Sequence, residues 1–135
     1  MKLALIPLIL LLLNTCGNSK SQKEIELNRQ FELKFGETAV IKSEHLAIRF
    51  SEVVQDSRCP KSVTCIAAGN ATIELDLGNS KGKASSVKLG TDQDSNETIY
   101  QQYKIKLIEI NPYPSSPGRI EPQLYSAILL VSSSQ

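Results

Sequence analysis

Two of the three cysteines, Cys59 and Cys65, lie in the stretch DSRCPKSVTCIAAGN, which runs from Asp56 to Asn70, with five residues between them. Thiols in such a pattern can bind a metal ion, form a redox pair, act as a nucleophile or close a structural disulfide. A thioredoxin-like redox pair uses C-x-x-C at the start of a helix in a βαβ setting. Neither that spacing nor that context is present here, so a redox pair is not expected.

The first residues indicate the compartment in which these cysteines fold. Met1 and Lys2 precede an almost entirely apolar run from Leu3 to Leu13, interrupted only by Pro7. A run of this length is too short for a helix that crosses a membrane, which takes roughly 20 residues, and it suits the apolar core of a secretory signal. We therefore expect residues 1–15 to form a signal peptide that exports the protein.

The export signal ends in Leu13-Asn14-Thr15-Cys16-Gly17, which resembles a bacterial lipobox because leucine stands three residues before a cysteine. Asn14 and Thr15 depart from the commonest lipobox, and the alternative is ordinary signal-peptidase cleavage nearby. Lipid attachment to Cys16 would account for the odd cysteine in an exported protein. A diacylglyceryl group also supplies the two chains that stable anchoring needs. We expect a lipid anchor that holds the protein on the bacterial cell envelope, at the outer membrane or the periplasmic face.

With Cys16 lipidated, the other two cysteines remain to be explained. A structural zinc site needs four nitrogen or sulfur ligands, and the only histidine, His45, leaves that set too small. A catalytic thiol needs a positioned histidine and would compete with disulfide formation in an oxidising compartment. The sequence therefore predicts a structural disulfide. Pro60 bends the chain directly after Cys59 and helps to bring the two Cα atoms to the ~5.5 Å that a bridge needs.

From Phe31 onward apolar and polar residues alternate with a period of two, which is typical of strands. About seven short runs show it, and they begin near Phe31, Ala39, Leu46, Ala71, Val87, Tyr103 and Ala127. The predicted disulfide loop lies between the run that ends near Asp56 and the one that begins near Ala71. In the run from Tyr103, Glu109 is expected on the same face as Leu107, and Ile110 on the opposite face. The segment 111–122 contains four prolines and is predicted to be a long crossover loop.

These patterns predict an all-β fold, a single antiparallel β-sandwich (Ig-like or related) of about seven strands. The sandwich is expected to occupy residues 29–135, behind a polar, flexible tether over residues 16–28.

Composition and motifs argue against several classes of function. The chain has 15 Lys plus Arg against 14 Asp plus Glu, a net charge of +1, so it lacks the basic footprint of a nucleic-acid binder. No paired-carboxylate, G-x-S-x-G or phosphate-binding glycine motif is present, so we assign no catalytic residue, metal or cofactor. Asp92, Asp94 and Asn96 alternate as in a calcium loop, but the glycine and glutamate of an EF-hand are missing, and a polar hairpin loop is favoured. His45 is interpreted as a surface residue.

The cysteine-containing stretch resembles the hallmark of an uncharacterised family of small bacterial secreted proteins and lipoproteins, frequent in Bacteroidetes. The matching residues are Asp56-Ser57-Arg58-Cys59-Pro60, Cys65-Ile66 and Ala68-Gly69. That hallmark often runs D-S-R-C-P-x-x-x-x-C-I-W-A-G, and Ala67 stands here where the family often has tryptophan. The segments NPYP at 111–114 and YSAIL at 125–129 are similar to the family's closing loop and final strand. The resemblance extends from about Gly36 onward and implies no activity.

Within this motif, Asp56 and Arg58 allow two interpretations. They could form an ion pair presented to a ligand. Alternatively, Asp56 accepts hydrogen bonds from turn amides while Arg58 packs across the loop, and this second interpretation is the one that the residue types favour.

The sequence thus favours a non-enzymatic lipoprotein module, held at the membrane by its N-terminal lipid. Such a module would be structural, or would bind an envelope protein through loops at one end of the sandwich. One alternative is a secreted protease inhibitor whose disulfide-stiffened or proline-rich loop fills a protease cleft. A metal-binding or enzymatic domain is the third, supported only by the Asp92 loop and His45.

Overall fold

The computed structural model describes residues 22–79 and 84–135. The predicted signal peptide (residues 1–15), the predicted lipid anchor Cys16 and the predicted tether up to residue 21 lie outside the described residues. The described residues form nine strands: β1 (Gln22–Glu24), β2 (Gln30–Lys34), β3 (Thr38–Ile41), β4 (Leu46–Asp56), β5 (Ala71–Asn79), β6 (Ser85–Gly90), β7 (Glu97–Tyr100), β8 (Tyr103–Asn111) and β9 (Ser126–Ser133).

Two short 3-10 helices, η1 (Lys42–Glu44) and η2 (Pro122–Leu124), complete the regular structure of the described residues. Within those same ranges, no helix combines the length and the apolar character needed to traverse a bilayer.

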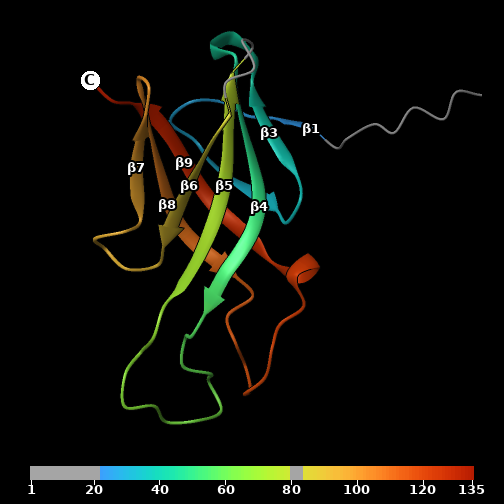
Figure 1. Ribbon diagram of the computed structural model, residues 1–135, viewed down its shortest axis with the longest axis vertical. Coiled ribbons are helices and arrows are strands. Elements are labelled where there is room, and N and C mark those ends of the chain that lie inside the picture. The colour runs from blue at the N-terminus through green and yellow to red at the C-terminus, as the bar shows by residue number, and fades with distance from the viewer. Residues whose placement is uncertain (1–21, 80–83) are drawn as a thin grey trace, which may run out of the picture.

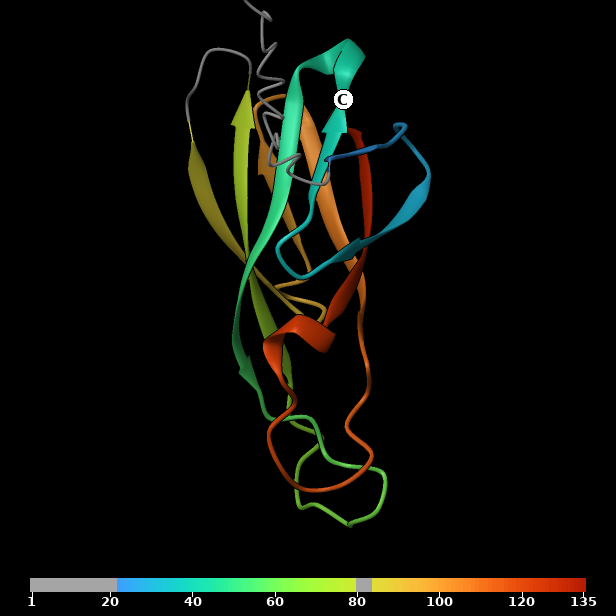
Figure 2. The ribbon, with the colours of Figure 1, turned by 90° about the vertical axis from the view of Figure 1, so that its right-hand side faces the viewer.

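The strands form two sheets that pack face to face (Figures 1 and 2). One sheet has the order β1-β3-β4-β5-β6 and the other the order β2-β9-β8-β7. All neighbours are antiparallel except β1, which pairs in parallel with β3. The predicted all-β sandwich is confirmed, with two strands more than the pattern of alternation predicts.

The core lies between the sheets and is built from the inward-facing positions of each strand. Strand β5 illustrates the alternation, since Ala71, Ile73, Leu75 and Leu77 are fully buried while the residues between them are partly exposed. Each large apolar side chain buried in this way contributes roughly 1.5–3 kcal/mol. Alternation with a period of two therefore fixes which face of each strand is turned inward.

Residues 22–28 belong to the fold, although the sequence predicts a tether over residues 16–28. Ile25 is buried, and its backbone N–H donates to the carbonyl oxygen of Val40 at 3.1 Å. The N–H of Asn28 donates to the carbonyl oxygen of Val131 at 2.8 Å, which joins this segment to the second sheet. A tether is thus not present over residues 22–28, because Ile25 and the partly buried Leu27 contribute to the core.

Strand β8 departs from simple alternation. A β-bulge between Leu107 and Glu109 adds one residue to the strand, so Ile110 is buried and Glu109 is exposed. The prediction that Glu109 shares the face of Leu107 is therefore wrong, because an inserted residue reverses the inside and outside positions that follow it.

The proline-rich segment after β8 is a hairpin loop and not a crossover. Strands β8 and β9 are direct antiparallel neighbours, and Asn111 at the end of one pairs with Ser126 at the start of the other. The prediction of a crossover is wrong because the strands on either side pair with one another. The loop between them, residues 112–125, leaves and re-enters the same sheet.

Candidate functional site

Two long hairpin loops extend side by side from one end of the sandwich (Figure 2). The first is the β4–β5 loop, residues 57–70, and the second is the β8–β9 loop, residues 112–125. Their backbones meet directly, since the N–H of Lys61 donates to the carbonyl oxygen of Pro114 and the N–H of Ser62 to that of Ser115, both at 3.1 Å. These two loops are called the loop end below.

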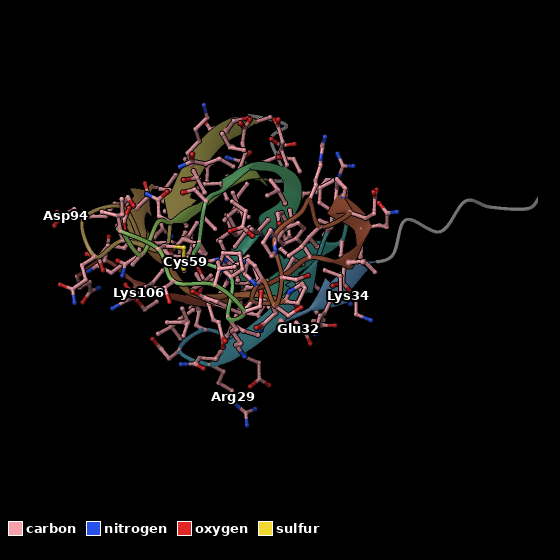
Figure 3. All side chains as sticks on the ribbon, turned by 90° about the horizontal axis from the view of Figure 1, so that it is seen from below. Arg29, Glu32, Lys34, Cys59, Asp94 and Lys106 are labelled. Atoms are coloured by element: carbon pink, nitrogen blue, oxygen red, sulfur yellow. A yellow bond between two sulfur atoms is a disulfide. The ribbon has the colours of Figure 1, made fainter. Side chains whose placement is uncertain are left out.

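The predicted disulfide closes the tip of the first loop. Cys59 and Cys65 are bonded, with their Cα atoms 5.9 Å apart, between the end of β4 at Asp56 and the start of β5 at Ala71. Both the bridge and its position in the fold are confirmed, and the bridge is visible beside Cys59 in Figure 3, which views the molecule from the loop end. Every residue from 61 to 69 is exposed, so the bridge stiffens a loop that is otherwise surrounded by solvent.

Arg58 joins the two loops from inside. Its Nε donates to Oδ1 of Asp56 at 2.8 Å and its Nη2 to Oδ2 at 2.7 Å, a two-pronged ion pair in which the side chains are only 6% and 8% exposed. The same guanidinium donates to the carbonyl oxygens of Ile110 at 2.7 Å and Pro112 at 2.9 Å. Asp56 also accepts from the backbone N–H of Arg58 at 3.3 Å. Arg58 thus packs across the loop and joins it to the β8–β9 loop.

Two tyrosines of the β8–β9 loop complete this network. The hydroxyl of Tyr125 donates to Oδ2 of Asp56, and the hydroxyl of Tyr113 donates to the carbonyl oxygen of Cys59, both at 2.8 Å. The Arg58 guanidinium lies 5.1 Å from the centre of the Tyr113 ring, within the range of a cation–π interaction. The sequence places both tyrosines in segments similar to the family pattern but gives them no role. That role depends on contacts between positions more than 50 residues apart.

The network sets the ionisation of its members. Burial raises the pKa of Asp56, but hydrogen bonds from Arg58 and Tyr125 and the charge of Arg58 outweigh burial, so the pKa lies below its ordinary value. Burial and the hydrogen bond to Asp56 raise the pKa of Tyr125 to about 12. Asp56 therefore remains a carboxylate and Tyr125 a neutral donor across the physiological range.

The end of the first loop depends on Gly69. This residue has φ +66°, and a Cβ at this position would lie 1.8 Å from the carbonyl oxygen of Ser57. Only glycine fits such a close approach. It allows the backbone N–H of Ser57 to donate to the carbonyl oxygen of Asn70 at 2.7 Å and the Ser57 hydroxyl to donate to the same oxygen at 3.0 Å. Ser57 and Gly69 therefore shape the base of the loop, while Pro60 lies directly after the disulfide-bonded Cys59.

The loop considered for calcium lies beside this base. The side-chain amide of Asn70 donates to Oδ2 of Asp92, and the N–H of Ser95 donates to the carbonyl oxygen of Asp92 at 3.1 Å. Asp94 lies at the periphery in Figure 3. In the described ranges no group of three or more acidic, histidine or cysteine side chains is placed to hold a metal ion. His45 is exposed, after η1 and next to the first residue of β4, and not at the loop end.

A cavity of about 470 Å³ opens between β4 and the β8–β9 loop. Its lining is mixed: valine, isoleucine and proline side chains lie beside polar ones, which include Asp56, Arg58 and Tyr125, and Arg119 contributes a charge. The remaining lining residues are Val53, Val54, Gln55, Ser57, Pro60, Pro114, Gly118, Ile120 and Pro122.

The exposed large apolar side chains of the loop end are Val63, Ile66, Tyr113 and Leu124, and Ile66 is fully exposed. These side chains and the cavity offer contact surface, whereas the polar groups of the motif are used inside the protein. The loop end and the cavity therefore offer surface for binding.

No protein-family model, curated protein or solved structure matches this chain.

Proposed function

We propose that this protein is an exported, lipid-anchored module of the bacterial cell envelope that binds a partner protein through its loop end. The observation that carries the proposal is the fully exposed Ile66 on a loop held by a disulfide and by hydrogen bonds to a second loop. A loop that is already ordered loses less conformational entropy on binding. Exposed aliphatic and tyrosine side chains on such a loop are suited to fill pockets on a partner.

The path of the chain also suits an anchored binder. Gln22 pairs with Thr38, and Thr38 pairs with Arg49 of β4. At ~3.3 Å per residue, Asp56 lies roughly 20 Å further along the same strand. Gln22, the first described residue, therefore lies away from the loop end.

The binding proposal is tested by chemical crosslinking in the native host, followed by purification of the protein from membranes. We expect a defined envelope protein to be crosslinked to the wild type and to be lost with Ile66→Asp. Ile99→Asp is the matched control, because Ile99 is also exposed but lies on β7, outside both loops. Equal crosslinking by the two variants, or a monomer with no partner and a clear hydrolytic turnover, would exclude the proposal.

The anchor is tested by the intact mass of the protein extracted from membranes. We expect the mass of a chain that begins at Cys16 and carries a diacylglyceryl group and one disulfide. An unmodified Cys16 in the native host would contradict the proposed location and leave the binding proposal to be tested on its own.

A protease inhibitor is a second candidate, because every residue from 61 to 69 is exposed on a loop that a disulfide restrains. Rigid, exposed loops of this kind can occupy a protease cleft without being ordered first. A panel of serine, cysteine and metalloproteases assayed with excess protein tests it, and undiminished activity of every protease would exclude it.

A further inference from the structure

Among the strands of the described residues, none covers one edge of β4 over its second half. Strand β3 pairs with β4 only as far as Arg49, and Phe50 then exchanges hydrogen bonds with the backbone of Gly36 and Glu37. Beyond that point β4 pairs only with β5, on its other side. Among the described residues, no backbone hydrogen bond joins residues 51–55 to any segment other than β5. This part of β4 therefore presents an open sheet edge.

The cavity of about 470 Å³ lies along this open edge. One wall is β4 itself, through Val53, Val54 and Gln55, and the other wall is formed by residues 118–122 of the β8–β9 loop. Figure 2 shows this loop, in orange and red, running beside the green end of β4. The hydrogen bond between Tyr125 and Asp56 joins the two walls at the end of β4. In the described part of the chain, no hydrogen bond joins Val53, Val54 or Gln55 to the β8–β9 loop. The edge thus faces a space and not a neighbouring backbone.

The charges of this cavity are unbalanced. Asp56 and Arg58 neutralise each other in their buried ion pair. Arg119 is the other charged residue of the lining; it is exposed, and it forms no ion pair with any described residue. The site therefore combines an open strand edge, an apolar contact surface that includes Val53 and Ile120 within a mixed lining, and one positive charge without an ion pair.

We propose that this cavity binds an extended peptide segment of the partner, which adds as a short strand to the open edge of β4. An extended peptide carries the alternating N–H and C=O groups that match such an edge, and pockets beside the edge then select its side chains. An apolar side chain of the peptide packs between Val53 and Ile120, and a carboxylate of the peptide pairs with Arg119. The two β-bulges of β4, between Phe50 and Glu52 and between Val53 and Gln55, keep the added strand short.

This inference rests on the proposed function, since it assumes a binding module, and it names the class of partner. It uses the side of the loop end and not its tip, so the two proposals can fail separately. Ile66→Asp tests the tip, whereas Arg119→Glu tests the cavity.

The probe is a phage-displayed library of random linear octapeptides, selected on the full-length protein in detergent. We expect the selected peptides to combine Asp or Glu with Val, Ile or Leu. Arg119→Glu should shift the selection to Lys or Arg and weaken a synthetic wild-type-selected peptide at least 10-fold. The matched control is Arg49→Glu, which makes the same charge change at an exposed position on the paired half of β4. This control should leave both the selection and the affinity unchanged.

Amide hydrogen exchange reports where the peptide binds. Adding the synthetic peptide should slow exchange in residues 51–56 and leave residues 61–67 unaffected. Failure to select any peptide, an acidic preference that survives Arg119→Glu, or slowing confined to residues 61–67 would overturn the inference. Slowing at residues 51–56 that rises with protein concentration in the absence of peptide would identify a second copy of the chain as the occupant and would also overturn it. If one of these outcomes is observed and Ile66→Asp still abolishes crosslinking to the envelope partner, the proposed function stands and only the peptide site is refuted.

Discussion

Replacing Arg58 with methionine tests what holds the loop end together. The substitution keeps most of the aliphatic stem but removes the guanidinium, and the carboxylate of Asp56 then loses its partner while its side chain is only 8% exposed. The carbonyl oxygens of Ile110 and Pro112 lose their donor as well. Breaking a buried ion pair by removing one member destabilises a protein by ~3–5 kcal/mol. The hydroxyl of Tyr125 continues to solvate the carboxylate, which favours the lower part of that range.

We therefore expect the free energy of unfolding to fall by about 3 kcal/mol, a large share of the ~5–15 kcal/mol that a small domain has in total. The assay is urea denaturation with the disulfide oxidised. The double variant Asp56→Asn, Arg58→Met removes the stranded charge and should recover part of the loss. Arg119→Met is the control, because an exposed arginine without an ion pair changes stability by no more than ~0.5 kcal/mol when replaced.

Two results would refute this reasoning. One is a loss below ~1 kcal/mol for Arg58→Met, which is the range of an exposed ion pair. The other is a double variant no more stable than Arg58→Met alone, which would mean that the stranded carboxylate is not the source of the destabilisation.

Four further predictions concern the same region. Gly69→Ala should lower the free energy of unfolding by about 3 kcal/mol or more, because strain and a clash combine; Gly36→Ala, which has φ +78° and open space around it, should lose only ~1–2 kcal/mol in the same urea titration. The pKa of Asp56 is below 3.8 in the folded protein, so its contribution to stability is complete above that pH and is lost on acidification. Asp56→Asn should therefore reduce the dependence of the free energy of unfolding on pH in the acid range. The pKa of Tyr125 rises from 10.0 to about 12, so its contribution to stability is complete below pH 10 and is lost as the pH rises towards 12. Tyr125→Phe should therefore reduce the slope of the free energy of unfolding against pH in this alkaline range, and an unchanged slope would contradict this. Reduction of the disulfide removes the closed loop from the unfolded chain and so raises the conformational entropy of that state. The free energy of unfolding should fall by about 2 kcal/mol in calorimetry, and a stability unaffected by reductant would contradict this.

The DSRCP motif has a consequence for where binding residues should be sought. Three of its members build the loop end: Arg58 and Asp56 join the loops, and Gly69 shapes the base of the first loop. The residues between Pro60 and Gly69 point into solvent. We therefore expect substitutions of Asp56, Arg58, Gly69 and the two cysteines to act through stability, and substitutions of the other residues between Pro60 and Gly69 to act through binding.

The sequence alone predicts much of the fold. Period-two alternation identifies every strand that contributes several buried side chains to the core, because burial of one face forces that pattern. It misses β1 and β7, which are short strands at sheet edges and contain no buried residue, so neither supplies a run of core positions. It also misses the reversal after Leu107, because an inserted residue follows from pairing with β9 and leaves no local pattern.

What the sequence by itself determined is local: which strands face a core, that the second and third cysteines form a bridge, and that this bridge lies between the strands ending at Asp56 and beginning at Ala71. What only the tertiary structure decided is which distant segments meet. The contacts of Arg58 with Ile110 and Pro112, and of Asp56 with Tyr125, join parts of the chain more than 50 residues apart. The cavity beside β4 exists for the same reason, since one wall comes from β4 and the other from the β8–β9 loop. Strand pattern and bridge arise from interactions between near neighbours in sequence, whereas the candidate site arises from the packing of two sheets, which no single segment encodes.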